Sequence, residues 1–281
     1  MPGGEEMEKA TLRRILVGRF SWKRLIRSTL IILVVLLILT FSCADSMIFR
    51  PPPAGYGVDD DLHWIETADG QRIAAMYFEK PGAEFTIIFS HGNAEDIGHN
   101  TEFFQTLNRW GYSVLAYDYR GYGLSEGRPS ERKAYQDIEA AYAWLVDTLG
   151  TDPCSVIALG RSIGSGPAVH LATCKPLAGL VLESGLTSAF RVMTRRGILP
   201  FDRFANIEKI AEVRCPVLVV HGLDDRIVPP WHGKALYEAA NEPKQFLWVE
   251  HAGHNDLAWV AGIRYRRAME EFVELISEMR R

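Results

Sequence analysis

From about residue 62 onward, the chain alternates short, β-rich apolar runs with amphipathic stretches. Eight runs predict strands, and Asp69-Gly70 joins the first two as a hairpin. The predicted strands span residues 62–68, 71–79, 85–90, 113–118, 155–160, 178–183, 216–221 and 245–250. Helical patterns lie at residues 94–109, 131–149, 163–173, 231–240 and 263–279. This alternation predicts an α/β domain with an eight-stranded, mostly parallel sheet, helices on both faces, and antiparallel pairing of the first two strands.

One long connection lacks a strand pattern. Residues 184–214 lie between the sixth and seventh predicted strands and are numerous enough for one or two short helices. We expect this segment to form a short cap over one edge of the sheet. The sequence therefore predicts a single domain over residues 62–281, with its cap at residues 184–214.

A separate apolar segment precedes this domain. Residues 28–44 carry no charge, and residues 30–39 are all aliphatic. A helix of this length would extend about 26 Å at roughly 1.5 Å per residue, which is close to the thickness of a membrane core. We expect one N-terminal transmembrane helix at residues 28–49, after a basic segment at residues 1–27 and before a linker at residues 50–61. Pro51-Pro52-Pro53 makes that linker stiff.

Charge around the apolar segment predicts its orientation. Basic residues precede it and three aspartates follow at residues 59–61, so the N-terminus is expected in the cytoplasm and the domain on the extracytoplasmic side. The basic residues are Arg13, Arg14, Arg19, Lys23, Arg24 and Arg27. Two alternatives stay open: a signal peptide cut after Ser42-Cys43-Ala44, and a lipoprotein precursor with lipid on Cys43.

Composition excludes several function classes. The 31 basic and 35 acidic residues give a net charge of −4, which argues against a nucleic-acid-binding surface. Four cysteines without paired C-x-x-C spacing do not indicate a zinc site, so neither metal nor cofactor is expected. Cys154 and Cys174 flank one strand–helix unit, and a disulfide between them is an open possibility if the domain is extracytoplasmic.

The strongest local motif is Gly160-Arg161-Ser162-Ile163-Gly164, which matches G-x-S-x-G between an apolar strand and a helical pattern. A nucleophilic serine needs a turn tight enough to project its hydroxyl from the edge of the sheet. Glycine on either side fits such a turn, because a Cβ there would collide with the neighbouring strand or helix. Ser162 is therefore the candidate nucleophile, and a plain turn or phosphate loop is the alternative interpretation.

A base and an acid are found at two later strand ends. Asp225 follows the seventh strand and His254 follows the eighth, so both are expected at the same carboxyl edge as Ser162. Their chain order, Ser then acid then His, suits this arrangement. Asp225 is preferred to Asp224 although spacing alone does not decide between them. His254 is preferred to His251, which ends the strand itself.

Backbone N–H groups are expected to stabilise an oxyanion. One is that of Ile163, directly after the nucleophile, where the helix N-terminus also favours negative charge. The second is expected in the turn after the third strand, Ser90-His91-Gly92-Asn93, with Asn93 as the candidate. The Asn93 side chain is expected at most to cap the following helix.

With these residues in place, the chain resembles the α/β-hydrolase domain-containing proteins of the Bem-type group, in particular domain-containing protein 17, whose animal members are membrane-attached protein depalmitoylases. The likeness runs from about residue 85 to residue 256. It rests on six blocks: Phe89-Ser90-His91-Gly92-Asn93-Ala94, Tyr117-Asp118-Tyr119-Arg120-Gly121-Tyr122-Gly123, Ser125-Glu126-Gly127-Arg128-Pro129-Ser130-Glu131, Gly160-Arg161-Ser162-Ile163-Gly164, His221-Gly222 with Asp225, and Gly253-His254-Asn255-Asp256. The chain departs from the depalmitoylases in having no cysteine-rich stretch in residues 1–27.

The resemblance implies an α/β-hydrolase fold, supports Asn93 in the oxyanion site, and implies Asp225 as the acid through the pattern H-G-x-x-D-x-x-V. It leads us to expect a membrane-anchored serine hydrolase of carboxylic esters or acyl-thioesters, with a lipid-like or acylated substrate. One alternative is a serine aminopeptidase of the same fold, for which the predicted cap is small. The other is a non-catalytic binding module.

Overall fold

The computed structural model describes residues 21–58, 62–194 and 202–280. Contacts divide the chain into two units, Met1–Ala44 and Asp45–Arg281. Helix α2, Trp22–Ile48, begins in the first unit and ends in the second, just before the three prolines. Among the described residues, no helix has both the length and the apolar character needed to cross a membrane, so the transmembrane helix expected at residues 28–49 is not confirmed.

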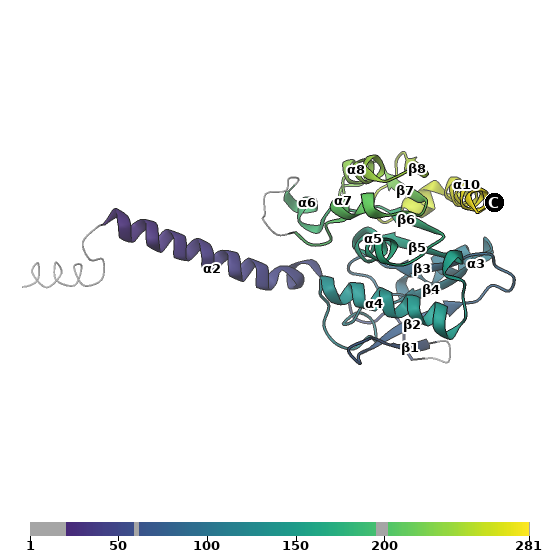
Figure 1. Ribbon diagram of the computed structural model, residues 1–281, viewed down its shortest axis with the longest axis horizontal. Coiled ribbons are helices and arrows are strands. Elements are labelled where there is room, and N and C mark those ends of the chain that lie inside the picture. Colours follow the sequence, from purple (N-terminus) through teal and green to yellow (C-terminus); the bar gives the residue numbers. More distant parts are fainter. Residues whose placement is uncertain (1–20, 59–61, 195–201, 281) are drawn as a thin grey trace, which may run out of the picture. The chain divides into compact units, whose positions relative to one another are not determined.

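The larger unit is built on one eight-stranded sheet, as predicted (Figure 1). The strand order is β1-β2-β4-β3-β5-β6-β7-β8. β1 pairs antiparallel with β2, β2 pairs antiparallel with β4, and the other five pairings are parallel. The strands are β1 Leu62–Glu66, β2 Arg72–Phe78, β3 Thr86–Ser90, β4 Ser113–Tyr117, β5 Val156–Arg161, β6 Gly179–Glu183, β7 Val217–Gly222 and β8 Lys244–Val249.

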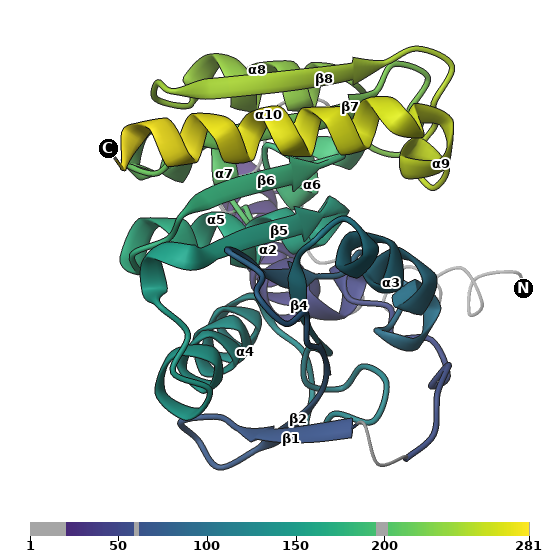
Figure 2. The same ribbon diagram turned by 90° about the vertical axis from the view of Figure 1, so that its right-hand side faces the viewer.

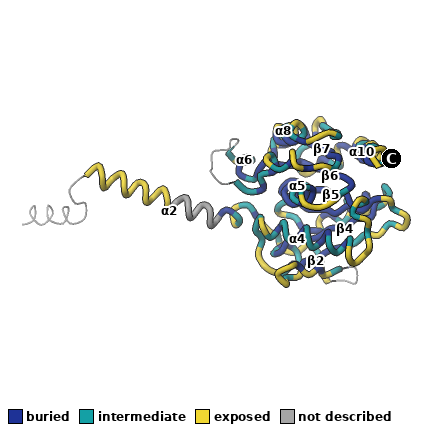
Figure 3. Tube along the Cα trace, viewed as in Figure 1, coloured by how far each residue is buried: buried dark blue, intermediate teal, exposed yellow. Residues whose placement is uncertain are grey.

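Helices cover both faces of the sheet (Figure 2). Because successive strand residues point to opposite faces, Ile87 and Ile88 of β3 belong to two different apolar clusters. The cluster around Ile87 packs on α3 (Thr101–Arg109) and α10 (Ile263–Met279). The cluster around Ile88 packs on α4 (Glu131–Ala143), α5 (Ser165–Cys174) and α8 (Trp231–Ala239). β5, β6 and β7 are almost wholly buried between these layers (Figure 3), as expected of a parallel sheet.

One helix predicted from the sequence starts at the wrong residue, and a second changes its geometry near its end. The helix expected from residue 94 begins only at Thr101, after a 3₁₀ turn at Gly98–Asn100. Ala94 lies in the left-handed region at φ +58°, and the Ile97 N–H donates to the Asp118 carboxylate at 2.9 Å instead of to a helical carbonyl. The helix expected at residues 131–149 leaves α geometry after Ala143, and a π-helical turn follows at Trp144–Thr148.

The described part of the cap contains two short helices, α6 Ala189–Thr194 and α7 Asn206–Lys209, followed by a 3₁₀ turn at Ile210–Glu212. The remainder of the predicted cap, residues 195–201, lies outside the described residues. A further short helix, α9 Leu257–Ala261, follows the His254 loop and was not predicted. Cys154 and Cys174 are free, so the possible disulfide between them does not form in this structure.

Candidate active site

Ser162 lies at the sharp turn between β5 and α5, within a 3₁₀ turn at Ser162–Gly164. Its φ of +54° is left-handed, which is strained for a residue with a side chain and typical of a nucleophile elbow. A Cβ on Gly164 would lie 2.1 Å from the Ser90 carbonyl oxygen, and one on Gly160 would lie 2.4 Å from the Gly164 carbonyl oxygen. Both glycines are therefore required for the close approach of this turn to β3 and α5.

The structure brings the three predicted side chains together. His254 Nε2 lies 3.0 Å from Ser162 Oγ, and His254 Nδ1 lies 2.7 Å from Asp225 Oδ2. Ser162, Asp225 and His254 come from the loops after β5, β7 and β8, at the carboxyl edge of the sheet. The imidazole thus bridges the hydroxyl and the carboxylate within hydrogen-bonding distance of both.

The candidate acid and base are more deeply buried than the residues of the same type near them. Asp225 is 4% exposed, whereas the Asp224 side chain is 65% exposed and lies beside His251, which is more exposed still. The second carboxylate oxygen of Asp225, Oδ1, accepts from the backbone N–H groups of Ile227 (2.9 Å) and Val228 (2.8 Å). Asp225 and His254 therefore belong to the hydrogen-bonded chain that ends at Ser162, and Asp224 and His251 lie outside it.

Electrostatics keep the Asp225 carboxyl ionised. Burial by itself raises its pKa, but hydrogen bonding from His221 and then His254 outweighs burial, so the net pKa lies well below its ordinary value. His221 is fully buried, with Nε2 2.8 Å from the Val228 carbonyl oxygen and 3.5 Å from Asp225 Oδ2. His221 was not among the site residues predicted from the sequence. Its place directly before the acid loop was the available signal that it supports Asp225.

The turn after β3 approaches the nucleophile closely, since a Cβ on Gly92 would lie 3.6 Å from the Ser162 Cβ. The Gly92 N–H already donates to the Glu95 carboxylate. The next N–H along the turn is that of Asn93, and Asn93, Ile163 and Ser162 line one cavity. This arrangement supports the two expected oxyanion donors.

The Asn93 side chain does not cap α3, contrary to the expected possibility. Its Oδ1 accepts from the Arg50 N–H (3.0 Å) and from the Tyr122 hydroxyl (2.7 Å), while its Nδ2 donates to the Ile48 carbonyl oxygen (2.6 Å). The side-chain amide of Asn93 therefore links residues 48–50 to the turn after β3. Sequence spacing gives no signal for a contact between positions more than 40 residues apart.

Two recesses meet at Ser162. One, of about 120 Å³, is polar and includes Glu95, Arg161 and His254. The other, of about 280 Å³, is mainly apolar and extends between the end of α2 and α6. The apolar side chains lining it include Met47, Ile48, Leu186, Phe190, Met193 and Ile227. A reactive carbonyl at Ser162 would therefore have a polar space on one side and an apolar space on the other.

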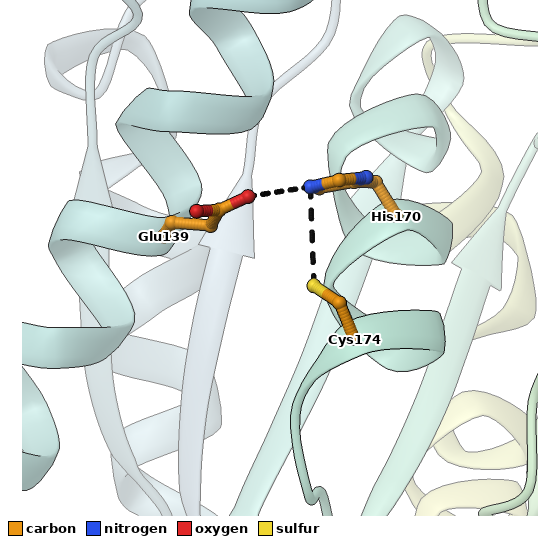
Figure 4. Close-up of side chains that lie close together, drawn as sticks. All are labelled: Glu139, His170 and Cys174. Atoms are coloured by element: carbon orange, nitrogen blue, oxygen red, sulfur yellow. Dashed lines mark hydrogen bonds and ion pairs between the residues drawn. The ribbon is translucent and has the colours of Figure 1, made fainter.

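A different cluster lies between α4 and α5, where Glu139, His170 and Cys174 converge (Figure 4). Their ligand atoms all lie within 4.8 Å of one another. The sequence analysis expected no metal and named none of these residues as ligands. His170 and Cys174 are four residues apart on one helix, but Glu139 joins them only through the packing of α4 on α5.

Comparisons with known proteins agree with this architecture. The family model described as serine aminopeptidase, S33, matches residues 82–199. The alpha/beta hydrolase domain-containing protein 17B of Homo sapiens is 42% identical over 217 residues, covering 75% of this chain and 75% of the relative. Protein 17C of Mus musculus is 39% identical over 217 residues, covering 76% of this chain and 67% of the relative.

Solved structures share the fold. An esterase from Pyrococcus furiosus superimposes with a TM-score of 0.66 at 22% identity, covering 80% of this chain and 98% of the esterase. A monoacylglycerol lipase from Paleococcus ferrophilus gives a TM-score of 0.58 at 20% identity, covering 72% of this chain and 98% of the lipase. At these identities the likeness shows the α/β-hydrolase fold alone. The identity to proteins 17B and 17C shows that the chain belongs to the α/β-hydrolase domain-containing protein 17 family. With the matching family model and fold, this membership makes the chain a serine hydrolase.

Proposed function

We propose that Ser162, His254 and Asp225 form the catalytic triad of a carboxylic-ester or acyl-thioester hydrolase. His254 Nε2 takes the proton of Ser162 Oγ as this oxygen attacks the substrate carbonyl, and the N–H groups of Asn93 and Ile163 stabilise the oxyanion. His254 then gives the proton to the leaving alcohol or thiol, and water releases the acyl group from Ser162. Asp225 orients the imidazole and stabilises its charged form. The observation that carries the proposal is the unbroken hydrogen-bonded chain from Asp225 through His254 to Ser162.

The apolar recess supports a lipid-like or acylated substrate. Its apolar lining would bury the methylene groups of an acyl chain, at a gain of about 0.8 kcal/mol for each. Lysophospholipids, acylglycerols and acylated proteins all present such a chain. The proposed mechanism requires neither a metal nor a cofactor.

A second candidate function is that of a serine aminopeptidase, which the description of the matching family model favours. The same triad would cleave an amide. The size of the cap argues against an aminopeptidase. The described cap helices have only six and four residues, and so offer few side chains to bind a substrate amine.

Labelling and a substrate panel test the proposal together. We expect the purified full chain to react with a fluorophosphonate probe, and to hydrolyse p-nitrophenyl esters and acyl-thioesters in preference to aminoacyl amides. Turnover of amides alone would move the assignment to the aminopeptidase. A chain that neither labels nor turns over any of these substrates would favour the binding module.

Asp225→Asn is expected to lower kcat by about 10⁴-fold, because an amide can neither hold the correct imidazole tautomer nor stabilise its positive charge. Asp224→Asn is the matched control, since this neighbouring carboxylate is exposed and does not contact His254. Steady-state kinetics on one ester would measure both. Equal losses in the two variants would contradict the assignment of Asp225.

Membrane attachment is a separate proposal, which rests on the sequence. We propose that the uncharged part of the predicted anchor, residues 28–44, inserts into a membrane, with the N-terminus in the cytoplasm and the folded unit from Asp45 onward on the extracytoplasmic side. In support, the side chains of residues 30–35 on α2 are aliphatic and each 47–57% exposed, and such surface is costly in water. We expect the full chain to remain in the membrane pellet after an alkaline carbonate wash. Quantitative release into the supernatant would contradict insertion.

A further inference from the structure

A group of three different metal-binding side chains lies at the packed surface between α4 and α5. His170 and Cys174 are one helical turn apart on α5, which places them on the same face of that helix. Glu139 reaches them from α4 (Figure 4). His170 Nε2 lies 2.6 Å from Glu139 Oε1 and 3.9 Å from Cys174 Sγ, so the three donor atoms surround one small volume. None of these residues takes part in the site at Ser162.

We propose that Glu139, His170 and Cys174 bind a thiophilic divalent cation of the Zn²⁺ type. A thiolate sulfur, an imidazole nitrogen and a carboxylate oxygen are the three donors that Zn²⁺ prefers, and the sulfur disfavours Mg²⁺ and Ca²⁺. Three protein ligands leave the fourth position of a tetrahedron for water. The site is therefore expected to be open to solvent and exchangeable, unlike a closed structural zinc site.

The geometry requires small adjustments. In a tetrahedral zinc site, nitrogen and sulfur ligands are about 3.6 Å apart, and nitrogen and oxygen ligands about 3.3 Å apart. The His170–Cys174 separation of 3.9 Å is close to the first value. The Glu139–His170 separation of 2.6 Å must widen. The Glu139 side chain is 42% exposed, so it can rotate without disturbing the core, and an ion can enter from solvent.

The imidazole is already oriented. Tyr135 of α4 stacks on His170 with ring centroids 4.2 Å apart and an interplanar angle of 17°. The Tyr135 hydroxyl donates to Glu131 at 2.7 Å and accepts from Lys209 at 3.0 Å, which fixes the tyrosine ring in turn. Such support from neighbouring side chains lowers the entropy lost when an ion binds.

Binding of Zn²⁺ at this site is coupled to the release of a proton. Cysteine binds Zn²⁺ as the thiolate and not as the neutral thiol. The thiol must therefore lose its proton to solvent when sulfur binds the ion. To bind the ion through Nε2, the imidazole must carry its single proton on Nδ1. One proton per ion is expected, and binding weakens as the pH falls.

Metal titration of the full chain, reduced and freed of metal, tests the proposal. We expect isothermal titration calorimetry to show one Zn²⁺ per chain, and runs in two buffers of different ionisation enthalpy to show about one proton released. Co²⁺ in place of Zn²⁺ should give a thiolate-to-metal charge-transfer absorption band. Cys174→Ala and His170→Ala are each expected to weaken Zn²⁺ binding by about tenfold or more and to remove or shift this band.

Cys154→Ala is the matched control, since Cys154 is also an exposed free thiol and should leave binding unchanged. Circular dichroism of each variant would report whether it folds, and Glu139→Gln is a milder third variant should an alanine variant fail. A wild-type chain without the cobalt band, or Zn²⁺ binding that is equally strong in Cys174→Ala, would overturn the proposal. Because these measurements are independent of ester hydrolysis, failure of the catalytic assignment would not affect them.

Discussion

Replacing Ser162 with alanine is expected to lower kcat/KM for ester hydrolysis by about 10⁵- to 10⁶-fold. The variant loses the oxygen that is proposed to attack the substrate carbonyl, and a methyl group has no lone pair with which to form the acyl-enzyme bond. A residual rate above that of water is expected from the oxyanion donors. Kinetics on a p-nitrophenyl ester would measure the loss, and mass spectrometry after fluorophosphonate treatment would show no adduct on the variant.

Ser277→Ala is the control for this change. The Ser277 hydroxyl donates to the Val273 carbonyl oxygen within α10, and it takes no part in the hydrogen-bonded chain at Ser162. This variant should keep both the adduct and the wild-type rate. An adduct that persists at another residue in Ser162→Ala, with turnover intact, would place the nucleophile elsewhere.

Replacing His254 with alanine is expected to lower kcat by a factor similar to that for Ser162→Ala, up to roughly 10⁶-fold. Ser162 would then have no group to take its proton. The reduction should appear in kcat and leave KM little changed, since the imidazole contributes to the transition state more than to substrate binding. Pre-steady-state kinetics would show that the burst of alcohol or thiol release is lost. The large effect follows from geometry, because His254 Nε2 is 3.0 Å from the nucleophile and its other nitrogen is bound to Asp225.

His251→Ala provides a stringent comparison, because this histidine lies only three positions away in the same loop. Its side chain is 90% exposed and lies beside Asp224, away from the hydrogen-bonded chain. We expect a rate within about twofold of wild type. If His251→Ala lost activity and His254→Ala kept it, the base would be misassigned.

The sheet could be predicted from sequence because its central strands, β3 to β7, are buried on both faces and read as short continuous apolar runs. Of the eight strands, each was located to within two residues at either end. The candidate site residues could be grouped from the predicted fold, since Ser162 comes directly after β5, and Asp225 and His254 lie in the loops that follow β7 and β8. Parallel strands bring such positions to one edge, so residues distant in sequence could be grouped without coordinates.

Features that depend on tertiary contacts were not predictable. The helix expected from residue 94 begins later because Asp118, directly after β4, accepts the hydrogen bond of the Ile97 N–H. The choice of Asp225 over Asp224 is explained by burial and two backbone hydrogen bonds, neither of which has a sequence pattern. Glu139 and His170 meet through helix packing, which spacing along the chain does not encode.

The attachment of residues 48–50 to Asn93 has a consequence for how the chain can be shortened. Phe49 is 5% exposed, and its ring packs edge-on against Tyr122 and Phe204, so this residue is part of the core. Cleavage after Arg50 would open a hole there, at about 3–5 kcal/mol for a buried phenylalanine, and would strip Asn93 of two backbone partners. Residues 48–50 therefore belong to the folded unit that begins at Asp45, and a shortened chain must keep them to preserve the turn that carries Asn93.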